Sequence, residues 1–163
     1  MVFVQLETTG GASGDKFLRF TVTTATTAGA VGPYTSPRVV VKPDTPYRAI
    51  GYVRSNATIT YSLNAEIRKS DGTSLGSAIS AGYKPISSTW TRLTVDVPPM
   101  AELGTLVITA YSPSRAWSPG ETVDFDGFML VEGTTTPNYA DGSSPGWTWN
   151  GTPNNSSSTG LAL

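Results

Sequence analysis

The sequence predicts an all-β fold, a two-sheet antiparallel β-sandwich, on three observations. Apolar and polar residues alternate in several segments of about five to ten residues, the period of a strand with one buried face. The 17 glycines and 12 prolines separate these segments, and both residue types favour turns over strand interiors. No long stretch has the composition of a strong helix.

The strands are expected in the order in which the alternating segments occur. The clearest alternation places Ile59, Tyr61 and Leu63 on one face and Thr60 and Ser62 on the other, so this strand buries one face and exposes a polar one. An Asp-Gly turn signal follows at residues 71–72. The expected strands are 2–7, 17–24, 37–43, 47–55, 57–67, 88–99, 104–112 and 123–133.

The composition changes after Gly133. Residues 134–163 are rich in Thr, Pro, Asn, Gly and Ser, and such a segment alone buries too little apolar surface to offset its chain entropy. We therefore divide the chain into a sandwich at 1–133 and an extended C-terminal connector at 134–163. Its aromatic residues are expected to hold it against the sandwich or a neighbouring chain: Tyr139, Trp147 and Trp149.

Composition also excludes several classes of function. The chain has no cysteine and no histidine, which excludes disulfides, cysteine zinc sites and Ser-His or Cys-His catalytic pairs. The net charge of −1 gives no reason to expect nucleic acid or a membrane surface as a partner. No apolar run approaches the roughly 20 residues that span a bilayer. The N-terminal residues lack the features of a signal peptide, and we expect them to be a truncation point inside a larger protein.

Four segments carry a family resemblance when they are taken in order: SGDKFLRFTVT, VKPDTPYRAIGYVRS, STWTRLTVDVPP and VDFDGFMLVEGTTTPNYADG. Together with the following GWTWNGT, they resemble the carbohydrate-binding-module-like jelly rolls of minor tail proteins of tailed bacteriophages, over residues 13–152. The resemblance implies a non-catalytic jelly roll in the phage tail of the virion. It further implies adhesion to bacterial cell-surface polysaccharide for host recognition, with other tail subunits as partners and homo-oligomers in the virion.

Two aspartates, Asp124 and Asp126, lie two residues apart on the last expected strand. Their side chains share a face, a spacing near that of an inverting glycosidase pair, but nothing else marks a catalytic cleft. The resemblance implies instead that Asp126 binds a structural Ca²⁺. That ion needs six to eight oxygen ligands, and Glu7 and Asp15 are the acids available to join it. The alternative is that Asp126 accepts hydrogen bonds from nearby backbone amides.

Aromatic and polar side chains supply the candidates for a sugar site, because sugar rings stack on apolar rings while their hydroxyl groups need polar partners. Trp117, with Arg115 beside it, lies in a proline-stiffened loop; the alternative is that it caps one end of the sandwich. Tyr34 lies in a loop as well. A row of polar residues on strand 57–67 is either a glycan groove or a solvated face. The full set of candidates is Trp117, Arg115, Tyr111, Tyr52, Tyr83, Arg54 and Asn64.

One further residue, Trp90, and two alternative functions complete the expectations from the sequence. The resemblance assigns Trp90 to the hydrophobic core. A structural or oligomerisation module of the virion tail without glycan binding is the main alternative function. A glycan-binding module appended to a secreted hydrolase would share the same fold.

Overall fold

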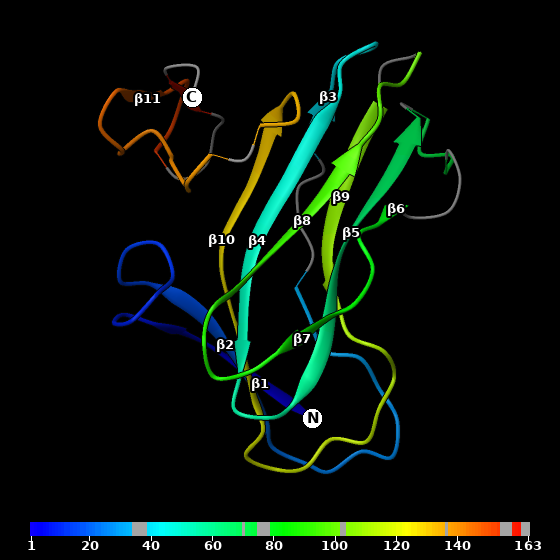
Figure 1. Cartoon of the computed structure of the whole chain (residues 1–163), viewed down its shortest axis with the longest axis vertical. Coiled ribbons are helices and arrows are strands. Elements are labelled where there is room, and N and C mark those ends of the chain that lie inside the picture. Colours follow the sequence, from blue (N-terminus) through cyan, green and yellow to red (C-terminus); the bar gives the residue numbers. More distant parts are fainter. Residues whose placement is uncertain are drawn as a thin grey trace.

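The computed structural model confirms an all-β fold built from two antiparallel sheets (Figure 1). It describes residues 1–33, 39–69, 71–74, 79–101, 104–135, 137–153 and 158–160. One sheet has the strand order β1-β2-β10-β4-β8, and we call it the first sheet. The second sheet has the order β3-β9-β5-β6, with β7 paired to β5. A two-stranded β11–β12 sheet lies in the C-terminal segment.

The described strands match the expected segments closely and add four short ones. The bounds of the first sheet are β1 Val2–Glu7, β2 Phe17–Val22, β10 Thr122–Glu132, β4 Tyr47–Ser55 and β8 Thr91–Val97. Those of the second sheet are β3 Val39–Val41, β9 Gly104–Tyr111, β5 Ile59–Lys69, β6 Ile79–Ser80 and β7 Lys84–Ile86. The C-terminal hairpin comprises β11 Trp147–Trp149 and β12 Ser158–Gly160.

The hydrophobic core lies between the two sheets. Every second residue of β5 enters it, as the alternation predicts: Tyr61, Leu63 and Ala65 are fully buried. Ser62 was expected on an exposed polar face and is fully buried as well, because β6 and its Ser80 hydroxyl lie against it. Phe125 of β10 packs edge-to-face on Tyr61, with ring centroids 5.6 Å apart. Such aromatic pairs stabilise a core beyond the effect of their buried area, so β5 and β10 fasten the two sheets together.

Strand β10 pairs with both β2 and β4 and contains a β-bulge between Asp126 and Met129. Gly127 sits in the bulge with a φ of 57°, a left-handed conformation that glycine adopts without a steric penalty. A Cβ atom there would lie 2.9 Å from the Tyr52 ring. Bulges redirect side chains, and Tyr139 of the C-terminal segment lies next to the first sheet at this bulge.

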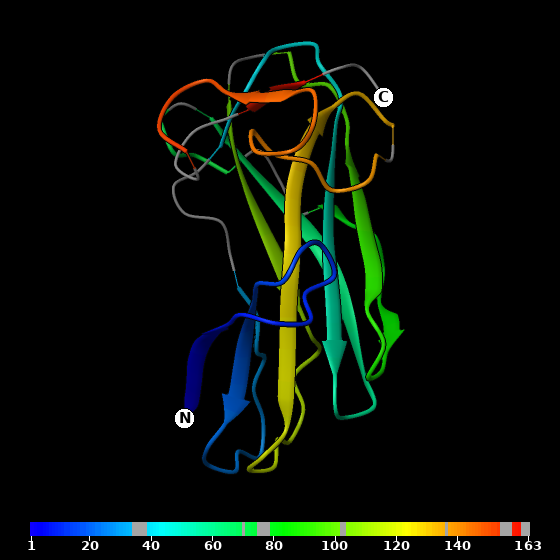
Figure 2. The ribbon, with the colours of Figure 1, turned by 90° about the vertical axis from the view of Figure 1, so that its left-hand side faces the viewer.

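The C-terminal segment lies against the outer face of the first sheet. Figure 2 shows that face, with β10 in yellow at its centre, the loop after β1 crossing β10, and the orange and red C-terminal hairpin above. Pro137 is buried, and its carbonyl oxygen accepts a hydrogen bond from Arg92. Tyr139 lies next to Gly127 in the bulge. Trp147 and Trp149 instead pack on Gly160 and Gly142 of their own segment.

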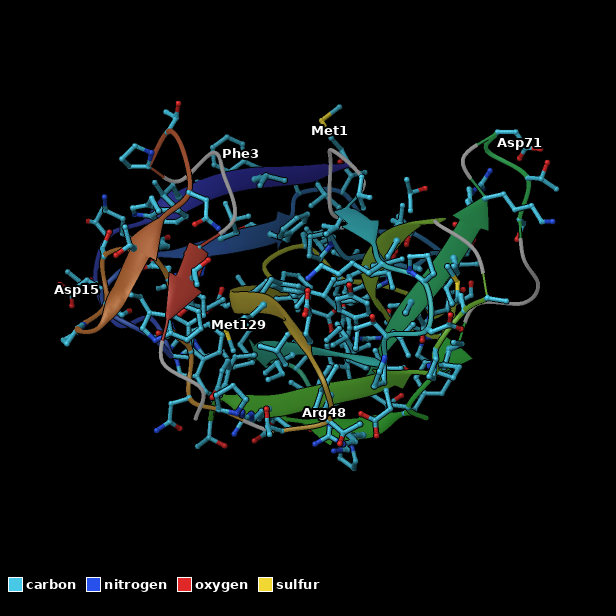
Figure 3. All side chains as sticks on the ribbon, turned by 90° about the horizontal axis from the view of Figure 1, so that it is seen from above. Met1, Phe3, Asp15, Arg48, Asp71 and Met129 are labelled. Carbon is cyan, nitrogen blue, oxygen red and sulfur yellow. The ribbon has the colours of Figure 1, made fainter. Side chains whose placement is uncertain are left out.

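Strand β1 is exposed from Val2 to Leu6, and only its last residue, Glu7, is half-buried. Among the described strands it pairs with β2 alone, and Figure 3 shows it at the rim of the molecule, where Met1 and Phe3 are labelled. In the part of the chain that the structure describes, no helix is long and apolar enough to cross a membrane.

Candidate functional site

Three of the candidate residues meet on the outer face of the second sheet. The register of β5 and β9 places Ser62 beside Tyr111 and Asn64 beside Thr109. Tyr83, in the loop after β6, lies with its ring centroid 6.5 Å from that of Tyr111, at an interplanar angle of 45°. Both tyrosines are exposed, at 49% and 38%. We call Tyr83, Tyr111, Ser62, Asn64 and Ser80 the tyrosine face.

Hydrogen bonds hold the polar side chains of the tyrosine face in place. The Ser62 hydroxyl lies 2.9 Å from Asn64 Oδ1 and 2.7 Å from the Ser80 hydroxyl. When Ser62 donates to Asn64, Ser80 donates to Ser62, and the Asn64 amide nitrogen has no hydrogen-bond partner among the described residues. A fixed amide donor beside two exposed rings is an arrangement that can orient a polar ligand.

Charged residues continue this face along β5. Glu66 accepts from Arg68, with 2.6 Å between the Arg68 guanidinium and Glu66 Oε1. Arg68 also donates to the carbonyl oxygen of Gly72, in the expected Asp-Gly turn. Both side chains are about one third exposed, so the ion pair contributes little to stability and its polar atoms remain accessible to solvent.

Trp117 and Arg115 do not form an exposed platform. Trp117 is only 3% exposed and belongs to the hydrophobic core. Its indole nitrogen donates to Gly29 O at 3.0 Å, and its backbone pairs with Thr26. Arg115 stacks on the indole at 4.4 Å and pairs with Glu121 at 2.7 Å. The candidacy of Trp117 as a sugar platform is therefore wrong, because the 23–33 loop covers it; the end-cap alternative holds.

Burial also affects Glu121. Burial alone would raise the pKa of this carboxyl group, but the backbone amide of Ser118 and the guanidinium of Arg115 outweigh it and lower the pKa. The loop that carries Trp117 is thus closed by a fixed ion pair. This ion pair fixes Arg115 on the Trp117 indole.

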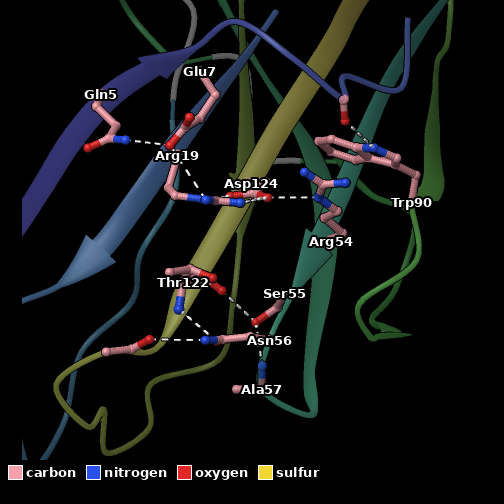
Figure 4. A network of polar contacts seen from close by, with 12 residues as sticks. Gln5, Glu7, Arg19, Arg54, Ser55, Asn56, Ala57, Trp90, Thr122 and Asp124 are labelled. Atoms are coloured by element: carbon pink, nitrogen blue, oxygen red, sulfur yellow. Dashed lines mark hydrogen bonds and ion pairs between the residues drawn. The ribbon is translucent and has the colours of Figure 1, made fainter. Parts of the chain in front are cut away.

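Tyr52 and Arg54 lie on the outer face of the first sheet, apart from the tyrosine face. Figure 4 shows Arg54 within a polar network around Asp124. Arg54 Nε donates to Asp124 Oδ2 at 2.7 Å, and Arg19 forms two further bonds to the same carboxylate at 2.8 Å. The hydrogen bonds to Asp124 raise the pKa of Arg19. Arg54 is thus held in an ion pair on the first sheet, and the structure does not bring it together with the tyrosine face.

Tyr52 packs against Gly127, and the Arg92 guanidinium lies 5.9 Å from its ring centroid. It is half-buried, and Tyr139 of the C-terminal segment lies near the same Gly127. Tyr34 lies outside the described residues.

Trp90 is not a core residue, contrary to expectation. It is half-buried on the outer face of the first sheet, and its indole nitrogen donates to Gly10 O at 3.2 Å. The Arg54 guanidinium lies between two rings, 4.4 Å from Trp90 and 4.7 Å from Phe17. Trp90 therefore shields the buried ion pair of Asp124 from solvent, a role that its position before a strand did not reveal.

Asp126 is held by backbone amides at the loop after β1. Its carboxylate accepts hydrogen bonds from the amides of Ser13 and Gly127 at 2.8 and 2.6 Å, as the alternative reading expected. In addition, a Cβ atom at Gly11 would lie 2.8 to 2.9 Å from three oxygens: Lys16 O, Gly14 O and Asp126 Oδ2. That position is one bond length from the Gly11 Cα atom, so the crowding requires glycine there and does not define a place for an ion.

Glu7 does not join Asp126 as a second acidic ligand. Its Oε1 lies 3.5 Å from the Arg19 guanidinium and accepts from Gln5. Within the described residues, no group of three or more acidic side chains gathers around a common position. Asp126 is therefore the acidic side chain that a Ca²⁺ ion would use here, in a structural role only, and calcium binding stays a prediction.

Comparison with known proteins defines the fold. No protein-family model matches the chain. A search of curated proteins finds no match either. Solved structures do match: the CBM22-1 xylan-binding domain of Paenibacillus barcinonensis Xyn10C aligns with a TM-score of 0.54 at 14% identity, over 83% of each chain. A carbohydrate-binding module of the β-sandwich superfamily with promiscuous specificity aligns with a TM-score of 0.58 at 18% identity, over 81% of this chain and 54% of that one.

The chain has the β-sandwich fold of carbohydrate-binding modules. The enzymatically active domain of tailspike protein 4 from bacteriophage CBA120 also aligns, with a TM-score of 0.60 at 11% identity. That match covers 80% of this chain but 18% of the tailspike chain. Identities this low establish a shared fold and nothing finer.

Sequence reasoning missed Ser80. It lies in β6, which has two residues and shows no readable alternation. Its partner Ser62 was seen only as part of a polar row. Only the pairing of β6 with β5 brings the two hydroxyl groups together.

Proposed function

We propose that this chain is a non-catalytic domain that binds saccharide on the tyrosine face. One observation carries the proposal: Tyr83 and Tyr111 are exposed side by side, next to the Asn64 amide and the Ser80 hydroxyl, which the buried Ser62 hydroxyl holds in place. An exposed ring stacks on the C–H face of a pyranose, and fixed amide and hydroxyl groups orient its hydroxyls. The two tyrosines have no role in the core that would explain them otherwise.

The proposed ligand is a polysaccharide of the bacterial cell surface, and the proposed setting is the tail of a phage virion. The ordered motifs of the sequence support this setting, and the likeness to a tailspike domain is compatible with it. The likeness to a xylan-binding domain supports the ligand class. Attachment to other tail subunits follows from the same proposal. A single site of this kind binds weakly and gains strength from multivalent display.

Titration with soluble oligosaccharides prepared from host cell wall tests the proposal, because a soluble fragment reports one site without avidity. We expect Y111A and Y83A each to weaken binding at least about tenfold, or about 1.4 kcal/mol, as removal of a dominant contact residue does. N64A should weaken binding less. F3A is the matched control, since Phe3 is 54% exposed but lies in the first sheet, and it should bind as the wild type does.

The rival function is a structural or oligomerisation module of the virion tail. The exposed strand β1 favours it. If the folded wild type binds no host glycan, or if Y111A and F3A bind equally well, the saccharide proposal fails and the structural function stands.

A further inference from the structure

Strand β1 has an open edge of unusual composition. Val2, Phe3, Val4 and Leu6 are 38%, 54%, 48% and 59% exposed, although β1 is a regular strand paired with β2 over six residues. No described strand pairs with its other side. Such an edge presents unpaired backbone groups together with apolar side chains, which is a template for another strand.

The hydrogen-bonding pattern shows which residues face the open edge. Thr23 donates its amide to Met1 O at 3.0 Å, while Val22 exchanges bonds with residues 120 and 121, away from β1. Hydrogen-bonded pairs alternate along an antiparallel ladder, so Phe3 and Gln5 direct their backbone groups toward β2. The backbone groups of Val2, Val4 and Leu6 therefore point to the open edge.

The other sheet edges carry features that discourage pairing. β3 is followed by Lys42 and Pro43, and β8 carries Arg92 and Asp96 before Pro98. β7 contains Pro85, and β6 is only two residues long. Charges, prolines and short strands are the means by which proteins protect exposed edges. Residues 2–6 have none of them, so the composition of β1 is that of a paired strand.

We propose that β1 pairs with β1 of a second copy of this chain, antiparallel about a two-fold axis at Val4. Hydrogen-bonded pairs must form between residues whose backbone groups point to the open edge. Val4 therefore pairs with Val4 of the second copy, and Val2 pairs with its Leu6. Apolar residues then face apolar residues in every hydrogen-bonded pair. The two Glu7 side chains are six residues apart along the joined strands, about 20 Å, and like charges at that distance are screened.

Side-chain direction adds to this match. Val4 pairs with Phe20 and Leu6 with Leu18 in β2. The side chains of Val4 and Leu6 therefore lie on the core-facing side of the first sheet, in the part that extends beyond the second sheet. Leu18 is likewise 40% exposed there. The two-fold axis joins the apolar stripes of both copies into one surface. Closed two-fold interfaces are the commonest in homo-oligomers, and a second copy offers the same unprotected strand.

Sedimentation of the full chain over about a hundredfold range of concentration tests the proposal by mass action. We expect the wild type to form a dimer and V4K to remain monomeric, because two lysines would meet at the axis. V40K is the matched control: Val40 is 64% exposed on β3, and its variant should dimerise as the wild type does. Circular dichroism melting shows whether each variant is folded.

Cysteine cross-linking tests the register separately, since the chain has no cysteine of its own. Hydrogen-bonded antiparallel partners have Cα atoms about 5.5 Å apart, within the range that a disulfide spans. V4C should therefore form a disulfide-linked dimer rapidly under mild oxidation. V2C should not, because the two Val2 residues are four residues apart, about 13 Å.

A monomer at every concentration overturns the proposal, as does a V4K variant that dimerises like the wild type. Equal cross-linking of V2C and V4C overturns the register. Binding of a soluble oligosaccharide to a single tyrosine face is independent of these outcomes, because that face lies in the second sheet.

Discussion

Asp124 and Asp126 share one face of β10 but have different environments. Asp124 is 2% exposed and forms ion pairs with Arg19 and Arg54. Asp126 instead accepts hydrogen bonds from two backbone amides at the edge of a loop. A buried carboxylate must be paired, since an uncompensated buried charge is strongly destabilising. Asp124 therefore organises Arg19, Arg54 and, through Arg54, the Trp90 ring.

We expect D124N to lower the free energy of unfolding by about 3 kcal/mol, the low end for a broken buried pair because both arginines remain partly exposed. Urea unfolding measures the change. The matched control is D96N, which removes the exposed partner of Arg48 and should cost less than about 1 kcal/mol. Equal losses in the two variants would contradict a special role for Asp124.

For Asp126, we expect Ca²⁺ to raise the melting temperature relative to the protein in chelator. A ligand that binds only the folded state at one hundred times its Kd stabilises it by about 2.7 kcal/mol. D126N should abolish the difference. E7Q should retain it, because Glu7 is turned toward Arg19. Identical wild-type melting temperatures with Ca²⁺ and with chelator would exclude the calcium site.

At the scale of elements, the bulge of β10 and the C-terminal segment depend on each other. Gly127 allows the bulge, and Tyr139 lies against it. Burial raises the pKa of Tyr139 to about 12, with further contributions from Asp141 and Asp126. The neutral phenol is therefore the form that fits this contact.

Because folding raises the pKa of Tyr139, its contribution to stability is fully present below pH 10. It is lost as the pH rises toward 12. We expect the wild type to lose more unfolding free energy than Y139F between these pH values. Urea unfolding at both pH values provides the measurement, and the subtraction removes the effect of the other tyrosines. Parallel losses in the two proteins would show that Tyr139 ionises without constraint.

The long strands were predictable because their alternation is a local property. β5 was expected at 57–67 and runs from Ile59 to Lys69. The short strands β6, β7, β11 and β12 were not predicted, since two or three residues carry no period and are stabilised by their partners. The same limit explains Trp117: a loop tryptophan reads as exposed until the 23–33 loop is known to cover it.

At the scale of the whole molecule, the two sheets have separate outer surfaces. The first sheet is covered by the loop after β1, the Asp124 network and the C-terminal segment (Figures 2 and 4). The second carries the tyrosine face. In the proposed dimer, two tyrosine faces belong to one particle, and two linked sites bind a repetitive polymer more strongly than one.

By itself, the sequence determined the fold class, the long strands and the exclusion of histidine and cysteine chemistry, because composition and alternation depend only on neighbouring residues. It also supplied Tyr83, Tyr111 and Asn64 as candidates. Only the tertiary structure decided that these three share a surface, while Trp117 enters the core and Arg54 is neutralised by Asp124. The physical reason is that sheet register joins residues distant in sequence, and that the burial of a side chain depends on which other segments of the chain pack over it.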